Sequence, residues 1–149
     1  MADAEVVVVG PGELPIIAEL YGEIFRPAKD ARFFRRRFQG RHNPLILLAH
    51  LDKRPVGFAT GFELKPNTFF SWLVGVLPQY RRTGVATRIH EAEVAWAREH
   101  GYKYIRMECQ NGHRPILHLC IATGFNIVGI RLDQDRSENL IIFEKTLEE

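Results

Sequence analysis

The sequence predicts an α/β (α+β) fold in which one mixed sheet is built in the order βααβββαβαββ. Three observations lead to this class. The spacing of apolar residues changes between strand-like and helix-like along the chain. Three predicted strands in the middle are joined by short turns, which makes them antiparallel. Both strand–helix–strand stretches lie in the second half, which favours parallel pairing around the central helix.

The first elements are a strand and two helices. A β-branched run over 6–9, ended by a Gly-Pro-Gly turn, predicts a buried strand. Apolar residues at steps of three and four predict a helix over 13–25. A second helix is expected over 30–39, where Asp30 is a suitable N-cap and Gly40 ends the pattern.

The remaining elements follow the same two spacings. An antiparallel meander is predicted over 44–51, 56–64 and 69–77. The second half is expected to hold a helix, a strand, another helix and two strands, over 84–100, 102–109, 114–122, 126–132 and 140–147. The helix over 84–100 is amphipathic, because its apolar residues form one stripe at steps of four, three and four.

The composition fits a single domain over residues 1–149. The chain has 149 residues, of which 46% are hydrophobic and 26% are charged, and its formal net charge is +2. This balance excludes intrinsic disorder and gives no indication of a nucleic-acid or membrane partner. The longest apolar runs are about half a dozen residues long, far short of the ~20 that a bilayer requires.

The N-terminus and the cysteines bear on the compartment. Asp3 and Glu5 stand where a secretory signal needs positive charge, so we expect a cytoplasmic protein. Cys109 and Cys120 are the only cysteines, and they lack the CxxC spacing of a redox or zinc site. We therefore expect two free thiols and no metal.

The most informative segment is the turn over 76–87, which joins a predicted strand to the long central helix. The first amides of a helix have no partner within it, and they point outward with the positive end of the helix dipole behind them. Gly84 and Ala86 leave this backbone open, and Arg81 and Arg82 add positive charge. The segment therefore predicts a phosphate site. The alternative is a glycine that only ends a turn, beside solvated arginines.

This segment resembles motif A of the GNAT superfamily of N-acetyltransferases, whose signature is Q/R-x-x-G-x-G/A. Here the motif reads Arg81-x-x-Gly84-x-Ala86. Gly124-Phe125 also stands where the last helix of the family ends in Gly-Phe. The order of predicted elements resembles that of the family over nearly the whole chain. The resemblance implies a single-domain GNAT acyl-CoA N-acyltransferase fold.

The resemblance also implies how acetyl-CoA is bound as a co-substrate. In this family, main-chain amides of the motif A loop hold the pyrophosphate, here beside the charge of Arg81. The corresponding residues are Arg82, Thr83, Gly84, Val85, Ala86 and Thr87. The pantetheine arm is expected to pair with the backbone near Val74 and Val76.

The expected catalytic pattern is where this sequence departs from the family. A tyrosine four residues before Gly-Phe often protonates the leaving thiolate, and an asparagine stands seven residues before that tyrosine. Cys120 and His113 occupy these two positions, and Asn111 is a candidate for a shifted asparagine. Cys120 is thus a candidate acid, and His113 and Asn111 are candidate cofactor contacts. The alternative for Cys120 is an ordinary core residue.

A general base is not indicated by the family pattern. Some members carry a glutamate on the strand before motif A, but residues 68–77 contain no carboxylate. Glu63 and Glu108, on other predicted strands, are candidates for reaching the cleft directly or through water. An ordinary surface or paired carboxylate is the alternative for each of them.

The second helix carries the densest positive patch of the chain. Its arginines are Arg32, Arg35, Arg36 and Arg37, followed by Arg41. The resemblance places this helix over the acceptor pocket. The spacing places Phe34 and Phe38 on one face, which packs inward or lines a pocket. Three interpretations of the patch are open. It is a solvated face, it is a docking surface for an acidic acceptor, or it contacts the CoA 3′-phosphate.

These features predict an acetyl-CoA-dependent N-acetyltransferase. The acetyl group would pass to a primary amine of a small molecule or a peptide, by direct attack in a ternary complex. A non-catalytic acyl-CoA-binding module with the same fold is the alternative, and a nucleic-acid binder that uses residues 32–41 is a third hypothesis. We expect a monomer or a homodimer, in which the last hairpin over 126–147 offers an edge to a second subunit.

Overall fold

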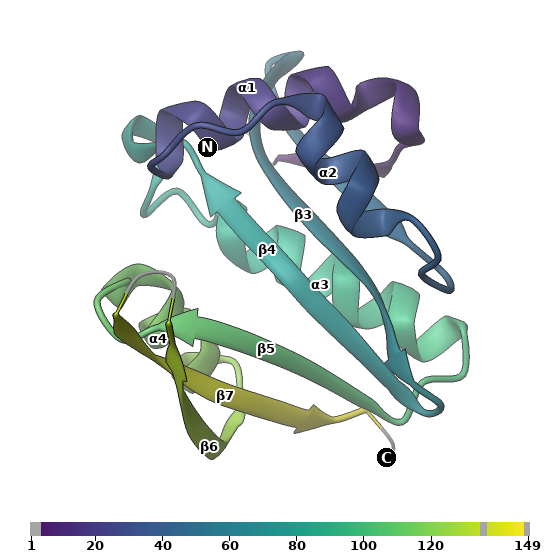
Figure 1. Ribbon diagram of the computed structural model, residues 1–149. Coiled ribbons are helices and arrows are strands. Elements are labelled where there is room, and N and C mark those ends of the chain that lie inside the picture. The colour runs from purple at the N-terminus through teal and green to yellow at the C-terminus, as the bar shows by residue number, and fades with distance from the viewer. Residues whose placement is uncertain (1–3, 135–136, 148–149) are drawn as a thin grey trace.

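The computed structural model describes residues 4–134 and 137–147 (Figure 1). The strands are β1 (Glu5–Val8), β2 (Leu45–Leu51), β3 (Arg54–Lys65), β4 (Thr68–Val76), β5 (Tyr104–Gln110), β6 (Asn126–Asp133) and β7 (Glu138–Thr146). The helices are α1 (Leu14–Ile24), α2 (Ala31–Phe38), α3 (Val85–Glu99) and α4 (Arg114–Ala122), with the short 3-10 helices η1 (Pro11–Glu13) and η2 (Pro78–Tyr80). The predicted order βααβββαβαββ is confirmed.

One mixed sheet runs through the molecule in the order β1-β2-β3-β4-β5-β7-β6. The first four strands form antiparallel pairs, and β4 and β5 are parallel partners joined by α3. β7 lies between β5 and β6 and is antiparallel to both. The order of elements predicts the mixed sheet, but not this place for β7, because a hairpin can dock through either of its strands.

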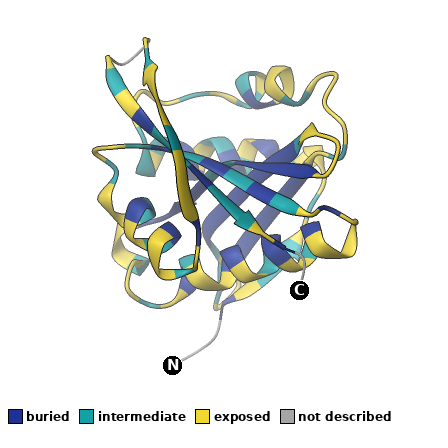
Figure 2. Ribbon diagram, turned by 90° about the horizontal axis from the view of Figure 1, so that it is seen from below, coloured by how far each residue is buried: buried dark blue, intermediate teal, exposed yellow. Residues whose placement is uncertain are grey.

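Helices cover both faces of the sheet. α1 and α2 pack on one face, where Ile17 and Phe34 are fully buried. α3 and α4 contribute Ile89 and Cys120 to the core on the other face. Figure 2 shows the central strands buried between these layers, while β6 is mostly exposed. Among the described residues, no helix is both long and apolar enough to cross a membrane.

Local signals set the start of α2, as predicted, and the end of α3. The Asp30 carboxylate caps α2, because its Oδ1 accepts a hydrogen bond from the Phe33 N–H at 3.1 Å. α3 is followed by Gly101, whose φ of 84° lies in the left-handed region that favours glycine. The prediction of a buried first strand is wrong. β1 pairs only with β2 at the edge of the sheet, and Val8 is 60% exposed, because a short β-branched run does not distinguish an edge strand from a central one.

The parallel strands β4 and β5 separate halfway along their length. Their ladder runs from Thr68 and Tyr104 to Ser71 and Met107, although both strands continue for several residues. At the same level the register of β4 against β3 shifts around Trp72, which marks a β-bulge. Figure 1 shows the arrowheads of β4 and β5 pointing apart. The sheet is therefore open on this side.

Candidate functional site

A cleft of about 670 Å³ opens where β4 and β5 separate. It is lined by both strands, by α1 and α2 with their connection, by the start of α4 and by the β6–β7 hairpin. The strands contribute Trp72, Leu73 and Val74 from β4 and Met107, Glu108 and Cys109 from β5. We call this hollow the β4–β5 cleft.

The edge of β4 that faces the cleft has no β5 ladder beyond Ser71. On its other edge, the N–H of Leu77 donates to Val56 O on β3 at 2.9 Å. Amides alternate in direction along a strand, so those of Val74 and Val76 point to the side that β5 has left. An extended ligand with amide groups can pair with this edge as an added strand does.

The loop before α3 presents main-chain donors to the solvent. Gly84, with a φ of 85°, is the N-cap of α3, and no side chain among the described residues caps this helix. The turn is fixed by a left-handed Arg82 and by Thr83, whose Oγ1 donates to Tyr80 O. A Cβ placed on Gly84 would meet no heavy atom within 4 Å. The first turn of α3 is therefore accessible to an anion.

Of the two residues predicted near the start of α4, only His113 reaches the cleft. Its ring lines the cleft, with a centroid 5.5 Å from that of Phe25. Burial, together with the positive charge of Arg81, lowers the pKa of His113, so its ring is neutral at pH 7. Asn111 is exposed, and its N–H donates to Asn139 O at 2.9 Å. Asn111 does not line the cleft.

Cys120 lies behind the wall of the cleft. It is 0% exposed, and its Sγ is 3.7 Å from Met107 Sδ and 3.9 Å from Cys109 Sγ. Met107 and Cys109 line the cleft, and Cys120 does not. Both thiols are free. The described part of the chain also contains no group of three or more His, Cys, Asp or Glu side chains that could hold a metal ion.

Glu63 and Glu108, the two predicted base candidates, lie in different places. The Glu63 Oε1 accepts a hydrogen bond from the Tyr102 hydroxyl at 2.9 Å, and that hydroxyl accepts one from Asn43 Nδ2 at 2.8 Å. Glu63 does not line the cleft. Glu108 does, and its Oε1 accepts hydrogen bonds from Arg131 Nη2 at 2.7 Å and Nε at 3.2 Å. The structure thus brings only Glu108 to the cleft.

An aromatic wall around Trp72 was not predicted from the sequence. The centroid of the Trp72 ring lies 5.8 Å from the ring centroid of Phe33, 5.7 Å from that of Phe34 and 5.8 Å from that of Phe38. Phe34 is fully buried and Phe38 is half-buried, as expected of an inward face. The only sequence signal for Trp72 is its place on a predicted strand, since the β-bulge and the helix opposite it arise from other parts of the chain.

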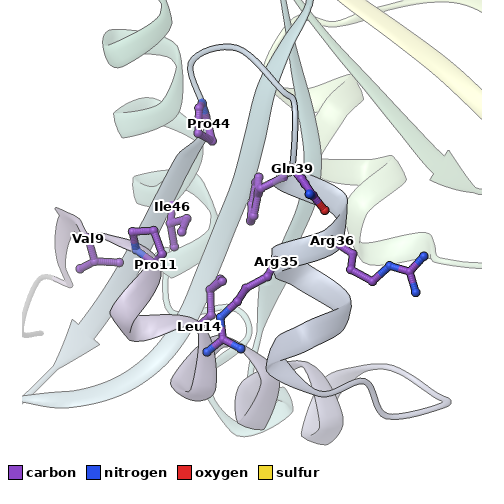
Figure 3. Close-up of a pocket in the computed structure, with 9 residues that line it drawn as sticks. Val9, Pro11, Leu14, Arg35, Arg36, Gln39, Pro44 and Ile46 are labelled. Atoms are coloured by element: carbon purple, nitrogen blue, oxygen red, sulfur yellow. The ribbon is translucent and has the colours of Figure 1, made fainter.

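The basic patch on α2 divides between the cleft and the surface. Arg37 lines the cleft, with its guanidinium carbon 5.2 Å from the centre of the Trp72 ring. Arg32 lies outside the cleft, with 84% of its side chain exposed. Arg35 and Arg36 line a second hollow of about 400 Å³ between η1, α2 and β2 (Figure 3).

A buried polar pair lies behind β4, at the level where the sheet opens. Ser71 is the last β4 residue paired with β5, and its Oγ donates to Glu93 Oε1 of α3 at 2.7 Å. Glu93 is 0% exposed. Burial raises its pKa to about 8, so the Glu93 side chain is neutral at pH 7. Its second oxygen has no hydrogen-bond partner among the described residues.

Comparisons with known proteins agree with this geometry. The family model described as Acetyltransferase (GNAT) family matches residues 14–125. A search of curated proteins gives no match. Solved structures that share the fold include the ribosomal-protein-S18-alanine N-acetyltransferase from Escherichia coli, with a TM-score of 0.84, 16% identity and coverage of 99% of this chain and 96% of that one.

Two further structures show the same likeness. The IAA acetyltransferase from Bacillus cereus has a TM-score of 0.82 and 16% identity, over 97% of this chain and 99% of that one. A GNAT family acetyltransferase from Elizabethkingia anophelis with acetyl-CoA bound has a TM-score of 0.75 and 14% identity, over 96% of this chain and 97% of that one. At such identities the likeness shows the fold.

Proposed function

Because the chain belongs to the acetyltransferase (GNAT) family, we propose that it is an acetyl-CoA-dependent N-acetyltransferase acting on a primary amine of a small molecule or a peptide. The observation that carries the proposal is the opening of β4 from β5 beside an uncapped helix N-terminus. A pantetheine arm and a pyrophosphate need these two features at one site. We also propose that residues 1–149 act as one domain.

The proposed cofactor contacts are mainly main-chain groups. The pyrophosphate would accept hydrogen bonds from amides of the loop and first turn of α3, beside Arg81. These residues are Arg82, Thr83, Gly84, Val85, Ala86 and Thr87. The pantetheine amides would pair with the backbone at Val74 and Val76, and His113 would lie against the arm. Asn111, which does not line the cleft, has the weakest support among the proposed cofactor contacts.

The proposed reaction is direct attack in a ternary complex. The lone pair of the neutral amine attacks the thioester carbonyl carbon, so that a C–N bond forms and the C–S bond then breaks. The amine nitrogen loses one proton, and the leaving thiolate gains one, giving the N-acetyl amide and free CoA. Both proton transfers need a partner at the cleft.

We assign to Glu108 the role of accepting the amine proton, because it is the candidate base that lines the cleft. Glu63 is tied to Tyr102 outside the cleft, which supports a structural role. The burial of Cys120 behind Met107 and Cys109 likewise supports packing over acid catalysis. A thiol has a pKa of about 8.5, so a thiolate can take its proton from water at neutral pH.

The experiment that tests this proposal measures free thiol released from acetyl-CoA in the presence of a panel of amines. Steady, amine-dependent release with formation of the N-acetyl product supports it. The alternative of a non-catalytic acyl-CoA-binding module predicts tight binding of acetyl-CoA without turnover of any amine. The absence of both binding and turnover would contradict the two hypotheses together.

The remaining parts of the proposal concern the setting of the enzyme. We propose that it acts in the cytoplasm as a monomer or a homodimer. Two free thiols 3.9 Å apart fit a reducing compartment. The edge strand β6 exposes Ile127, Val128, Ile130 and Leu132, which favours pairing with a second copy over leaving that edge in water.

A further inference from the structure

We propose that the acceptor is a primary amine that also carries a carboxylate and an aromatic ring, and that Arg37 binds this carboxylate. The inference rests on the proposed acetyl transfer and adds to it the chemical class of the acceptor. It is carried by the charges and rings at the end of the β4–β5 cleft that faces α2.

Cations outnumber carboxylates at this end of the cleft. Lys29, Arg37 and Arg131 line it, together with the carboxylates of Glu108 and Asp133. Glu108 accepts two hydrogen bonds from Arg131, and the charge of Asp133 also stabilises the Arg131 guanidinium. Both carboxylates therefore act on Arg131, and the charge of Glu108 also attracts Arg37. The excess positive charge remains on the α2 side, at Arg37 and Lys29.

Arg37 has the surroundings of an anion site. Its guanidinium carbon lies 5.2 Å from the centre of the Trp72 ring and 5.9 Å from that of Phe62. Among the described residues, no carboxylate lies within ion-pair distance of Arg37. The nearby charges of Arg41 and Arg131 repel its charge, while the charge of Glu108 attracts it. A guanidinium stacked on rings keeps its N–H groups available for a carboxylate, and an arriving anion would relieve the repulsion.

The charge of the acceptor itself also indicates a carboxylate. A free primary amine is mostly protonated near neutral pH, and a cleft with excess positive charge repels such an ammonium group. An amine that also carries a carboxylate has no net charge. Its carboxylate can face Arg37 while its amino group, which gives one proton to solvent before it attacks, faces Glu108. Complementary charges of this kind select one orientation of a ligand.

The rings of the cleft indicate the rest of the acceptor. Phe33 and Trp72 both line it, with ring centroids 5.8 Å apart, and both are only partly buried. Lys29 Nζ lies 5.0 Å from the centre of the Phe33 ring, on the same rim. Exposed faces of Phe and Trp bind aromatic groups by stacking or edge-to-face contact. An aromatic amino acid therefore satisfies the charges and the rings together.

The first test compares three amines that share one ring, at saturating acetyl-CoA. They are L-phenylalanine, its amide and phenethylamine, which lacks the carboxylate. We expect kcat/KM to be about 10- to 100-fold higher for L-phenylalanine, the range that one charge-assisted contact supplies. Equal values for the three amines, or a preference for the amide, would overturn the inference.

The second test asks whether Arg37 causes this preference. In Arg37→Ala we expect the kcat/KM of L-phenylalanine to lie within about threefold of that of the other two amines. In Arg37→Lys we expect the preference to be partly retained, since lysine keeps the charge but lacks the paired N–H groups of the guanidinium. Arg36→Ala is the matched control, because Arg36 lies on the same helix but lines the second hollow (Figure 3). A preference that survives in Arg37→Ala, or is lost equally in Arg36→Ala, would overturn the assignment.

A binding measurement separates this inference from the proposed function. Calorimetric titration of L-phenylalanine into the CoA-loaded protein needs no turnover. Binding by wild type that is lost in Arg37→Ala supports the inference even if no amine is acetylated. Turnover of all three amines at equal rates supports acetyl transfer and overturns the inference. If L-phenylalanine shows no binding and no turnover, the inference is also overturned.

Discussion

The two ends of the β4–β5 cleft are built from different parts of the chain. At the end where we propose that the cofactor binds, the polar groups are main-chain amides of β4, followed along the chain by those of the first turn of α3 around Gly84. At the acceptor end, the polar groups are side chains such as Arg37, Glu108 and Arg131, which come from α2, β5 and β6. One end offers a fixed backbone shape, and the other offers side chains that substitution can change.

This difference has a physical consequence for specificity. A main-chain amide is present whatever the side chain, so the cofactor end tolerates most substitutions that leave the space in front of it open. The proposed acceptor end depends on which charges and rings face the cleft, because a charge on the wall of a cleft attracts one sign of ligand and repels the other. The comparison predicts that cofactor affinity and acceptor choice respond to separate sets of substitutions.

The largest effect is expected at the acceptor end, from Glu108→Gln. Removing a general base costs about 10²- to 10⁴-fold in rate, and we expect kcat to fall within this range while acetyl-CoA binding is retained. Glu144→Gln is the matched control, because Glu144 is similarly exposed and pairs with Arg106 at 2.7 Å, outside the cleft. Steady-state kinetics of both variants check this, and equal losses in the two would rule out a special role for Glu108.

The next effect is expected at the cofactor end, from Gly84→Glu. The new carboxylate would occupy the open space before the first amides of α3, and we expect the Kd for acetyl-CoA to rise at least about 100-fold. Gly101→Glu is the control, since Gly101 has a φ of 84° against 85° for Gly84 and lies at the other end of the same helix. Calorimetry compares the two variants. Unchanged affinity in Gly84→Glu would place the phosphates elsewhere.

A smaller effect concerns Glu93, behind the point where the two ends meet. Burial raises the pKa of Glu93 from 4.5 to about 8, so the folded state keeps a proton that the unfolded state releases. The free energy of unfolding should therefore fall as pH rises from about 4.5 to about 8. Glu93→Gln mimics the protonated form, and we expect it to stabilise the protein by roughly 5 kcal/mol at pH 9 and hardly at all at pH 4.

Denaturant unfolding at several pH values measures this difference. The exposed Glu91 on the same helix supplies the control variant Glu91→Gln, which should change stability little at any pH. Stabilisation by Glu93→Gln that does not depend on pH would contradict a protonated Glu93. Loss of acetyl-CoA binding in this variant would show that the buried pair acts on the cleft.

The smallest effect on activity is expected from Cys120→Ala. Because Cys120 is buried beside Met107 and Cys109, we expect kcat to stay within about threefold of wild type. The free energy of unfolding should fall by about 1 to 2 kcal/mol from the lost packing. Kinetics and unfolding are measured on the same preparation. A loss of kcat above about 100-fold in a folded variant would favour the alternative of Cys120 as the acid.

The sequence predicts the cofactor end better than the acceptor end for a physical reason. The turn around Gly84 is one contiguous segment, so residue spacing alone identifies an uncapped helix start after a strand. The acceptor end unites Arg37, Trp72 and Arg131, which stand far apart in the chain. Their meeting depends on the β-bulge at Trp72 and on the docking of the last hairpin through β7, and neither leaves a pattern in the sequence.

The same limit applies to Glu63 and Cys120. The spacing of apolar residues places Glu63 on a strand and Cys120 on a helix. Which side of each element faces the cleft is known only once the register of the sheet is known. Phe34 and the N-cap Asp30 were predictable because they depend on spacing within one helix.

The measurement that tests the central claim most directly is calorimetric titration of acetyl-CoA into wild type, Gly84→Glu and the double variant Arg37→Ala with Trp72→Ala. If main-chain groups hold the cofactor and side chains select the acceptor, the double variant should bind acetyl-CoA within about threefold of wild type. Gly84→Glu should show at least about 100-fold weaker binding. Weak binding in the double variant together with normal binding in Gly84→Glu would contradict this division of the cleft.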